Sequence, residues 1–312
     1  MKKLILTITS NPSVDIGYRL DSFQLDAGNR VDDVSKTAGG KGLNVTRVLR
    51  QLEEEVAATG FLGGSLGMFI RKEISQLGVH DHFITISGDT RNCIAIIHGD
   101  GRQTEILESG PVISEEEAAS FLRQFSEDAQ SEDVNLITIS GSLPKGLPAD
   151  FYTRLIQIAT QHQKPVLLDT KGDLLALALA SNHKPYLIKP NQEELTAMSG
   201  QKDIDPVEAL QSPNFAGIPW IVATMGSDGA VVKHREALYR VTIPEAETKN
   251  PVGSGDSVIA GFAAGLSRGL SEEELIQFAL SMGVLNAIEE QTGAVDLKKI
   301  DWCMSEMGIE RL

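Results

Sequence analysis

The chain has 312 residues, of which 41% are hydrophobic, so it is long enough to form one large α/β unit around a buried core. Its two cysteines, Cys93 and Cys303, form no CxxC pair, which argues against a disulfide scaffold or a structural zinc site and indicates a reducing cytoplasm. The formal net charge of −15 excludes attraction to nucleic acid or an anionic membrane through the overall field, so an anionic ligand would need cations concentrated in one cleft.

The first third of the chain predicts a buried strand and a small separate sheet. Residues 4–9 are apolar and threonine-rich, and we interpret them as a strand because the run is too short for a signal peptide or for a membrane span of ~18 residues. Residues 16–35 are extended with turns, and residues 92–107 alternate around Gly99-Asp100-Gly101 as a hairpin does. We expect a β lid with strands from about residues 12–37 and 89–108.

Strand-like and helical patterns alternate through the rest of the chain. The strand-like runs are 134–139, 166–169 and 186–189, and the helical patterns between them are 149–162 and 173–180. Three further helices are predicted at 255–267, 271–289 and 297–307. This order predicts a largely parallel sheet with helices on both faces. Because the sequence shows no repeat and no linker, we expect residues 1–312 to form a single domain.

A glycine-rich motif near the carboxyl terminus is the strongest chemical signal. Asn250-Pro251-Val252-Gly253-Ser254-Gly255-Asp256-Ser257 precedes a helix of small residues. Glycines at a helix start let backbone N–H groups converge on one oxyanion, and the helix dipole adds to that attraction. A transferring phosphoryl group needs such a cradle, and Asp256 beside it would accept the proton of an attacking hydroxyl. A helix merely capped by glycine and aspartate would show the same residues.

A second glycine-rich loop, Ala38-Gly39-Gly40-Lys41-Gly42-Leu43-Asn44, also runs into a helical pattern. Its spacing is neither the Walker A pattern nor G-x-G-x-x-G. Lys41 and Asn44 would lie near the helix N-terminus and face a polyol phosphate, unless the loop is only a tight turn with a surface lysine. A third motif, Gly63-Gly64-Ser65-Leu66-Gly67, fits the nucleophile elbow of a serine hydrolase, but the sequence shows no recognisable triad histidine.

The two glycine-rich helix starts resemble the paired signatures of the ribokinase-like, phosphofructokinase-B carbohydrate kinases. Three segments between them are similar in order to the sugar loop, the N-x-x-E motif and the nucleotide loop of that family: Ser140-Gly141-Ser142-Leu143-Pro144, Lys189-Pro190-Asn191-Gln192-Glu193-Glu194 and Thr224-Met225-Gly226-Ser227-Asp228-Gly229. The resemblance covers nearly the whole chain. It implies a three-layer α/β/α sandwich with a mostly parallel sheet and a small β lid, and a kinase that uses ATP with Mg²⁺.

The resemblance also implies roles for individual residues. Asp256 would be the catalytic base, beside a cradle of N–H groups from Gly253, Ser254 and Gly255. The implied sugar-binding residues are Asp15, Gly39, Gly40, Asn44 and Ser140, with Lys41 and Arg91 on the non-reacting phosphate. The implied nucleotide-binding residues are Lys189, Asn191, Thr224, Gly226 and Gly229, and Glu194 would act on Mg²⁺ directly or through water. A monovalent cation beside the cradle and a homodimer paired through the lid edges are further expectations.

The substrate expectation rests on finer similarity within the family. Residues 36–41, 90–96, 103–108 and 250–254 are most similar to members that phosphorylate D-tagatose 6-phosphate at its C1 hydroxyl, giving D-tagatose 1,6-bisphosphate. The alternative is a 1-phosphofructokinase, which converts fructose 1-phosphate to fructose 1,6-bisphosphate. The sequence does not separate these two substrates from fructose 6-phosphate. A non-catalytic sugar-phosphate sensor is a more remote alternative, which the retention of Asp256 and its cradle disfavours.

Two positions depart from the family pattern. Ser254 stands where many relatives have alanine, and we expect little harm because the cradle uses backbone groups. Arg30 follows Ala27-Gly28-Asn29 in a segment where many phosphosugar kinases carry a lysine, and its role stays open.

Overall fold

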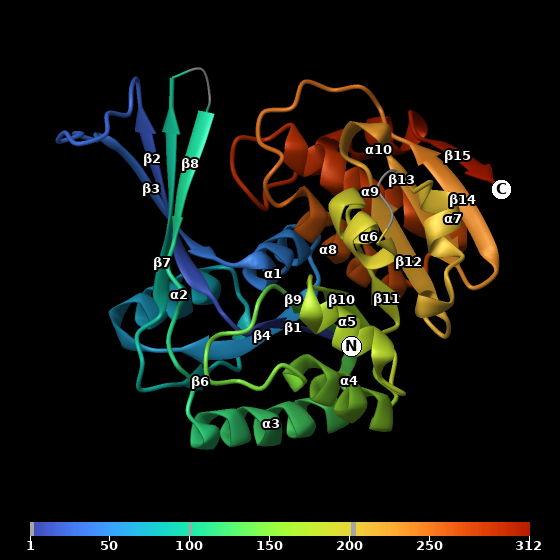
Figure 1. Ribbon diagram of the computed structural model, residues 1–312, viewed down its shortest axis with the longest axis horizontal. Helices are drawn as coiled ribbons and strands as arrows, with labels where there is room; N and C mark the ends of the chain where they lie inside the picture. Colours follow the sequence, from blue (N-terminus) through green and yellow to red (C-terminus); the bar gives the residue numbers. More distant parts are fainter. Residues whose placement is uncertain (1–2, 100–101, 201–203) are drawn as a thin grey trace.

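The computed structural model describes residues 3–99, 102–200 and 204–312, and its described strands form two sheets (Figure 1). The strands of the larger sheet are β1 (Leu4–Thr9), β4 (Glu55–Leu62), β5 (His80–Asp81), β6 (Ile84–Thr85), β9 (Val134–Ser140), β10 (Val166–Asp169), β11 (Leu187–Ile188), β12 (Trp220–Thr224), β13 (Ala230–His234), β14 (Ala237–Thr242) and β15 (Gly308–Arg311). Their order is β15-β14-β13-β12-β11-β10-β9-β1-β4-β5, with β6 also paired to β4. All pairs from β5 to β12 are parallel, and β13, β14 and β15 extend the sheet antiparallel.

Helices cover both faces of this sheet. One layer contains α1 (Lys41–Gln51), α2 (Gly64–Gln76), α8 (Ser254–Arg268), α9 (Glu272–Ala287) and α10 (Ile300–Ser305). The opposite layer contains α3 (Glu115–Gln130), α4 (Phe151–Gln161), α5 (Asp173–Ala180), α6 (Gln192–Ser199) and α7 (Pro206–Leu210). Short 3₁₀ turns occupy Pro213–Phe215, Gly226–Asp228 and Leu297–Lys299. The predicted three-layer α/β/α fold with a mostly parallel sheet is therefore confirmed.

The central strands are mostly apolar, as strands with both faces buried usually are. In β1, Ile5 belongs to the core under α1 and α8, whereas Leu6 and Ile8 belong to the core under α3 and α4. The same alternation places Leu167 and Leu168 of β10 in opposite cores. Side chains on alternate faces of a strand explain why these runs read as continuous hydrophobic segments.

The smaller sheet has the order β3-β2-β7-β8 and lies outside the sandwich. Its strands are β2 (Ser13–Leu20), β3 (Asp33–Gly39), β7 (Arg91–His98) and β8 (Arg102–Leu107). Strands β2 and β7 are parallel, and each outer strand is antiparallel to its neighbour. Figure 1 shows this sheet, called the lid from here on, standing away from the main body beside α1. Asp100 and Gly101 of the predicted hairpin turn lie outside the described residues, and the single-domain assignment stays a prediction.

The carboxyl-terminal segment differs from the sequence prediction. Residues 297–307 were expected to form one helix, but the structure has a 3₁₀ turn followed by the short helix α10. The Asp296 carboxylate caps the turn by accepting the N–H of Lys298 at 3.1 Å. Residues 308–311 then form β15 on the edge of β14, a pairing that no local sequence pattern indicated. Among the described residues, no helix is long and apolar enough to cross a membrane.

Parallel strands end at a common edge, and polar residues gather there. Ser10 follows β1, Ser140 and Asp169 end β9 and β10, Lys189 follows β11, and Thr224 ends β12. In the parallel register, Ser140 lies opposite Asp169. Ligands of open α/β sheets bind outside the carboxyl ends of the strands, so the functional site is expected at this edge.

Candidate active site

Asp256 lies in the first turn of α8, and its side chain is almost fully enclosed, with 5% of the residue exposed. The preceding Gly253 has φ 84°, a left-handed conformation that suits glycine. The Asn44 amide of α1 donates to Oδ2 of Asp256 at 2.8 Å. Two glycine-rich helix starts, more than two hundred residues apart in the sequence, therefore meet at one carboxylate.

The surroundings of Asp256 raise its pKa to about 7. Burial is the largest cause, and the negative charge of Asp169 adds to it. Lys41, the Asn44 hydrogen bond and Lys189 act in the opposite direction. A carboxyl group with a pKa near the working pH is well matched to taking a proton from a hydroxyl.

An ionic cluster around a second buried carboxylate, Asp169, lies beside Asp256. Asp169 is 1% exposed, and its Oδ2 lies 3.2 Å from Nζ of Lys41, while Oδ1 lies 3.5 Å from Nζ of Lys189. Burial acts to raise the pKa of Asp169, but the two ammonium groups outweigh it and hold the pKa below its usual value. Lys41 begins the helix on the sugar side, and Lys189 precedes the nucleotide segment, so one carboxylate connects the two halves of the site.

Asp169 was not among the predicted site residues. It ends a predicted strand, and its position at the carboxyl edge of a parallel sheet was the available signal. The pairing with lysines on two other segments could not be seen in the sequence. Lys41, which was expected on the distal phosphate, instead has its ammonium group beside Asp169 and within the electrostatic influence of Asp256.

The predicted sugar side lies where the lid meets α1. Ser13 donates to Oδ1 of Asp15 at 2.6 Å, and burial raises the pKa of Asp15 against the opposing effects of Ser13, Arg47 and Arg91. A Cβ atom at Gly39 would lie 2.0–2.2 Å from the Asp15 carboxylate, so only glycine lets the two segments approach. Gly40 has φ 100° and starts α1 directly after this contact.

Arg91 and Ser140 lie at the base of the lid and at the end of β9. The Arg91 guanidinium donates to the carbonyls of Glu108 at 2.8 Å and Asn11 at 3.2 Å. Its buried Nε and the buried Ser140 hydroxyl have no hydrogen-bond partner among the residues that the structure describes. Buried polar atoms are normally satisfied, so unpaired donors at a predicted sugar-phosphate site are consistent with a ligand that completes them. Arg30 is exposed in the segment between β2 and β3.

Arg47 of α1 was missed by the sequence prediction. Its guanidinium donates to Oδ1 of Asn44 at 3.1 Å, to the carbonyl of Thr292 at 2.9 Å and to the carbonyl of Ala38. By holding the amide oxygen of Asn44, Arg47 turns the amide nitrogen toward Asp256. An arginine one helical turn after Asn44 was the available sequence signal.

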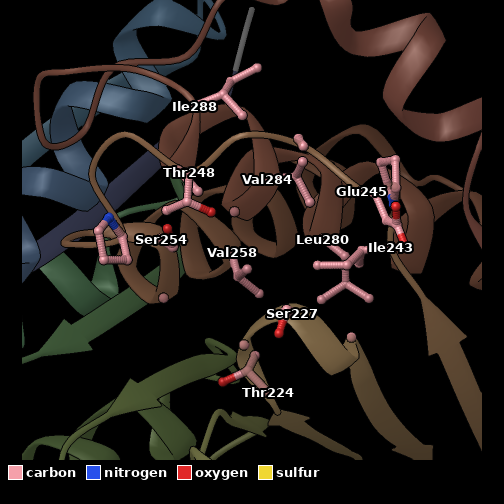
Figure 2. A pocket seen from close by; sticks show the side chains of 18 residues that line it. Thr224, Ser227, Ile243, Glu245, Thr248, Ser254, Val258, Leu280, Val284 and Ile288 are labelled. Carbon is pink, nitrogen blue, oxygen red and sulfur yellow. The ribbon is translucent and has the colours of Figure 1, made fainter.

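A cavity of about 390 Å³ lies between α8 and α9 on one side and the segment after β12 on the other (Figure 2). Thr224, Gly226 and Gly229, three of the five predicted nucleotide residues, line it, whereas Lys189 and Asn191 are not part of its lining. Apolar side chains such as Val258, Leu280 and Val284 supply another part of its wall, as Figure 2 shows. Ser254 and Gly255 line the same cavity, so a flat apolar base held here would have its phosphates beside the predicted cradle.

The predicted cradle is only partly directed at a ligand in this structure. The Ser254 N–H donates to the carbonyl of Pro251 at 3.2 Å, so its use on a phosphate would require that bond to be exchanged. At Gly255, a Cβ atom would lie 2.8 Å from Nζ of Lys189. Because glycine has no side chain at this position, the Lys189 ammonium lies close to the positive N-terminus of α8. An anion bound there would offset the positive charge of the lysine and of the helix end.

Asn191 and Glu194 form a capping box at the start of α6. The Asn191 side chain accepts the N–H of Glu194 at 2.8 Å, and Oε2 of Glu194 accepts the N–H of Asn191 at 3.0 Å. The N-x-x-E pattern thus has a local structural role. No cluster of three or more acidic, histidine or cysteine side chains suited to a metal occurs among residues 3–99, 102–200 and 204–312.

The serine-hydrolase motif has a packing explanation. Gly63 precedes α2, and a Cβ atom there would lie 1.8 Å from the carbonyl oxygen of Gly88. A Cβ atom at Gly64 would lie 1.8 Å from the Asp89 carboxylate. These glycines allow the tight turn between β4 and α2, so the motif needs no catalytic explanation.

A buried carboxylate at the start of α8, with a partly apolar cavity lined by the same helix start, has the arrangement that phosphoryl transfer needs, because that reaction depends on positioning and charge stabilisation at one point. The model of the pfkB family of carbohydrate kinases matches residues 8–299. The chain belongs to this family of carbohydrate kinases. Kinases of this family use ATP with a divalent metal.

Solved structures agree with this assignment. The chain is 31% identical to a putative phosphofructokinase from Staphylococcus aureus, with a TM-score of 0.85 and 99% of each chain covered. It is 24% identical to phosphofructokinase-2 from Escherichia coli in complex with potassium, with a TM-score of 0.88 and 98% and 99% of the two chains covered. It is 23% identical to a possible 1-phosphofructokinase from Thermotoga maritima, with a TM-score of 0.87 and 99% of each chain covered. The last two show the fold.

Asp256 as the base predicts a rising pH profile. Because the ionised carboxylate accepts the proton, kcat/KM should increase with pH through an apparent pKa near 7. Asp256→Asn should lower kcat by ~10²–10⁴ while leaving the melting temperature and sugar-phosphate binding nearly unchanged. Steady-state kinetics from pH 5 to 9, with calorimetric binding of the sugar phosphate, would check both. Near-normal turnover by the variant would remove Asp256 from this role.

Asp169 should influence that profile through its charge. Asp169→Asn removes a negative charge that raises the pKa of Asp256, so the ascending limb of kcat/KM should move to lower pH as the maximum rate falls. Asp150→Asn, which loses only an exposed pair with Arg154, is the matched control and should leave the profile in place. An ascending limb at the wild-type position in Asp169→Asn would contradict the coupling.

Proposed function

We propose that this kinase transfers the γ-phosphoryl group of ATP to the C1 hydroxyl of D-tagatose 6-phosphate, giving D-tagatose 1,6-bisphosphate and ADP. The observation that carries the chemical part is the buried Asp256 at the start of α8, held by Asn44 and flanked by the lysines that share Asp169. The choice of sugar rests on the similarity of residues 36–41, 90–96, 103–108 and 250–254 to tagatose-6-phosphate kinases.

In this mechanism the C1 hydroxyl gives its proton to the Asp256 carboxylate as its oxygen attacks the γ-phosphorus. The charge that develops on the transferring group is stabilised by the N–H groups around Gly255 and by the dipole of α8. Lys41 and Lys189 add two positive charges close to this path. Asp15 on β2 is suited to accept hydrogen bonds from the sugar hydroxyls, since a carboxylate offers two acceptor oxygens.

The non-reacting phosphate is assigned to Arg91, whose buried Nε lacks a partner. An arginine fork matches phosphate oxygens in pairs. Binding energy from this distal group would hold the opposite hydroxyl in line for attack. Asn44 and Ser140 complete the proposed sugar site from α1 and the end of β9.

The proposed divalent metal is Mg²⁺, bound with ATP. The residues present fit a metal that is held mainly by nucleotide phosphates and water, because Mg²⁺ in kinases takes few protein ligands. Glu194 would act on this metal directly or through water, and Lys189 and Asn191 would contact the phosphates. When bound, the metal would neutralise part of the phosphate charge.

A 1-phosphofructokinase activity is the second candidate. The relatives described as phosphofructokinases favour a ketohexose phosphate, and the structure of the site suits either sugar equally. Both reactions give ketohexose 1,6-bisphosphates. One site would therefore hold either substrate, although the phosphate is on C6 of tagatose 6-phosphate and on C1 of fructose 1-phosphate. Discrimination by a single hydroxyl configuration is worth only a few kcal/mol.

The test is ADP release with Mg-ATP, comparing kcat/KM for tagatose 6-phosphate, fructose 6-phosphate and fructose 1-phosphate. We expect the highest value for tagatose 6-phosphate. A preference for fructose 1-phosphate would retain the mechanism and replace the substrate with the second candidate. A preference for fructose 6-phosphate would reject both assignments of the sugar.

Arg91→Ala should chiefly weaken the use of the phosphosugar. Loss of a charge-assisted contact of ~1.5–3 kcal/mol would lower kcat/KM by about 10- to 100-fold. KM for ATP should change little, and any weak turnover of unphosphorylated tagatose should be unaffected. Arg154→Ala, which removes an exposed arginine, is the control. An unchanged kcat/KM for the phosphosugar would make the distal-phosphate assignment wrong.

We also propose a homodimer formed through the lid. Strands β3 and β8 are the unpaired edges of the small sheet, and Val34, Ile106 and Leu107 on them are exposed. Exposed edges with apolar side chains favour pairing with a second copy. Light scattering at micromolar concentration should give twice the monomer mass, and Ile106→Lys should shift the protein toward monomer. A monomeric wild-type protein would contradict the dimer proposal.

We propose that the reaction takes place in the cytoplasm.

Potassium is present in the E. coli phosphofructokinase-2 complex, and a monovalent cation beside the cradle was one expectation for this chain. Whether this kinase needs such a cation depends on the groups that already bind the oxygen atoms around the cradle.

A further inference from the structure

Asn286 lies near the end of α9 and has no exposed surface. Its amide nitrogen donates to the carbonyl of Val252 at 2.9 Å and to the Ser254 hydroxyl at 3.3 Å. Its amide oxygen accepts the N–H of Gly293 at 2.7 Å. One buried amide therefore connects α9 to both sides of Gly253 and to the loop that follows α9.

Two loops meet at this amide. The cradle loop (Asn250–Gly253) precedes α8, and the return loop (Glu290–Gly293) follows α9. The Asn250 side chain donates across the gap to the Glu290 carbonyl at 3.1 Å and to the Thr292 hydroxyl at 3.3 Å. A Cβ atom at Gly253 would lie 2.5 Å from the Thr292 side chain, so the loops are in close contact.

The oxygens of these loops already face N–H donors. The Thr292 carbonyl accepts Nη1 of Arg47 at 2.9 Å, and the Val252 carbonyl accepts the Asn286 amide. A monovalent cation needs several oxygens that converge on one point. A guanidinium cation and positively polarised amide hydrogens at those oxygens would repel it. The N–H donors of Arg47 and Asn286 therefore hold the two loops in place, as a bound cation would otherwise do.

We propose that Asn286 is a positioning residue for phosphoryl transfer, which holds the cradle loop against α9 so that turnover does not depend on a monovalent cation. Ser254 supports this role, because its hydroxyl, which alanine would lack, is the second acceptor of the Asn286 amide. The proposal rests on the kinase activity of the site and not on which ketohexose phosphate is the substrate.

The first test uses the wild-type protein in KCl, NaCl and tetramethylammonium chloride at equal ionic strength. The expected result is that kcat differs by less than about twofold among the salts, and that the melting temperature without substrates is the same in all three. Activation by K⁺ of more than about fivefold, or a melting temperature raised by K⁺ alone, would overturn the proposal.

The second test uses Asn286→Asp, which keeps an acceptor for the Gly293 N–H but places a carboxylate oxygen against the Val252 carbonyl. In tetramethylammonium chloride, kcat should fall by about 10- to 100-fold, and KM should change less. This loss is smaller than the ~10³-fold loss that removal of an oxyanion donor can cause, because Asn286 acts through the loop and not on the phosphate itself. K⁺ should restore part of kcat and raise the melting temperature, because a cation can bridge the new pair of oxygens. Wild-type kcat in this variant without K⁺ would overturn the positioning role.

Two further variants separate this role from simple destabilisation. Asn286→Ala should lose kcat, and its rescue by K⁺ should be smaller than that of Asn286→Asp, since it frees the Val252 carbonyl but adds no negatively charged oxygen. Asn135→Asp is the matched control, because Asn135 donates to Ser267 at 3.0 Å on another part of the fold, and it should keep kcat and show no response to K⁺. If no ketohexose phosphate is turned over, the substrate proposal fails, but the positioning role of Asn286 can still be tested by melting temperature. A melting temperature that responds equally to K⁺ in the wild type and in Asn286→Asp would overturn the positioning role.

Discussion

The buried carboxylate of Asp169 is the group on which the rest of the site depends. An isolated charge at the carboxyl edge of the sheet would be strongly unfavourable, so Asp169 requires the ammonium groups of Lys41 and Lys189 beside it. These lysines belong to the segments that we assign to the sugar phosphate and to the nucleotide. Their shared carboxylate brings the two segments together, and its negative charge contributes to the raised pKa of Asp256.

The parallel sheet makes this convergence possible. Residues that end or follow successive strands, such as Ser140, Asp169 and Lys189, reach the same edge although many residues separate them in the chain. Helices α1 and α8 then bring Asn44 and Asp256 to that edge. The lid leaves the main body just before α1, so the side chain of Asp15 can lie directly over Gly39.

The distribution of charge and polarity follows the chemistry. In a chain with a net charge of −15, Lys41 and Lys189 lie beside the same carboxylate, where anionic groups would bind. The cavity beside α8 and α9 is largely apolar, which suits the nucleotide base that we propose for it, whereas the predicted sugar side carries polar groups without a partner among the described residues. Behind the predicted cradle, Arg47 and Asn286 make hydrogen bonds that connect the loops around Asn44 and Ser254 to the rest of the fold.

The sequence by itself determined the layered α/β/α fold, the lid segments and the positions of Asp256 and the glycine loops. These features depend on periodicity and on the local backbone freedom of consecutive residues, which a sequence displays directly. It did not reveal β15, because an edge strand of four residues is chosen by its neighbour. Only the tertiary structure decided that Asp169 joins Lys41 to Lys189 and that Asn286 holds Ser254. Such pairs depend on strand order and helix packing. These bring distant residues together, and the local sequence around each residue does not indicate its partner.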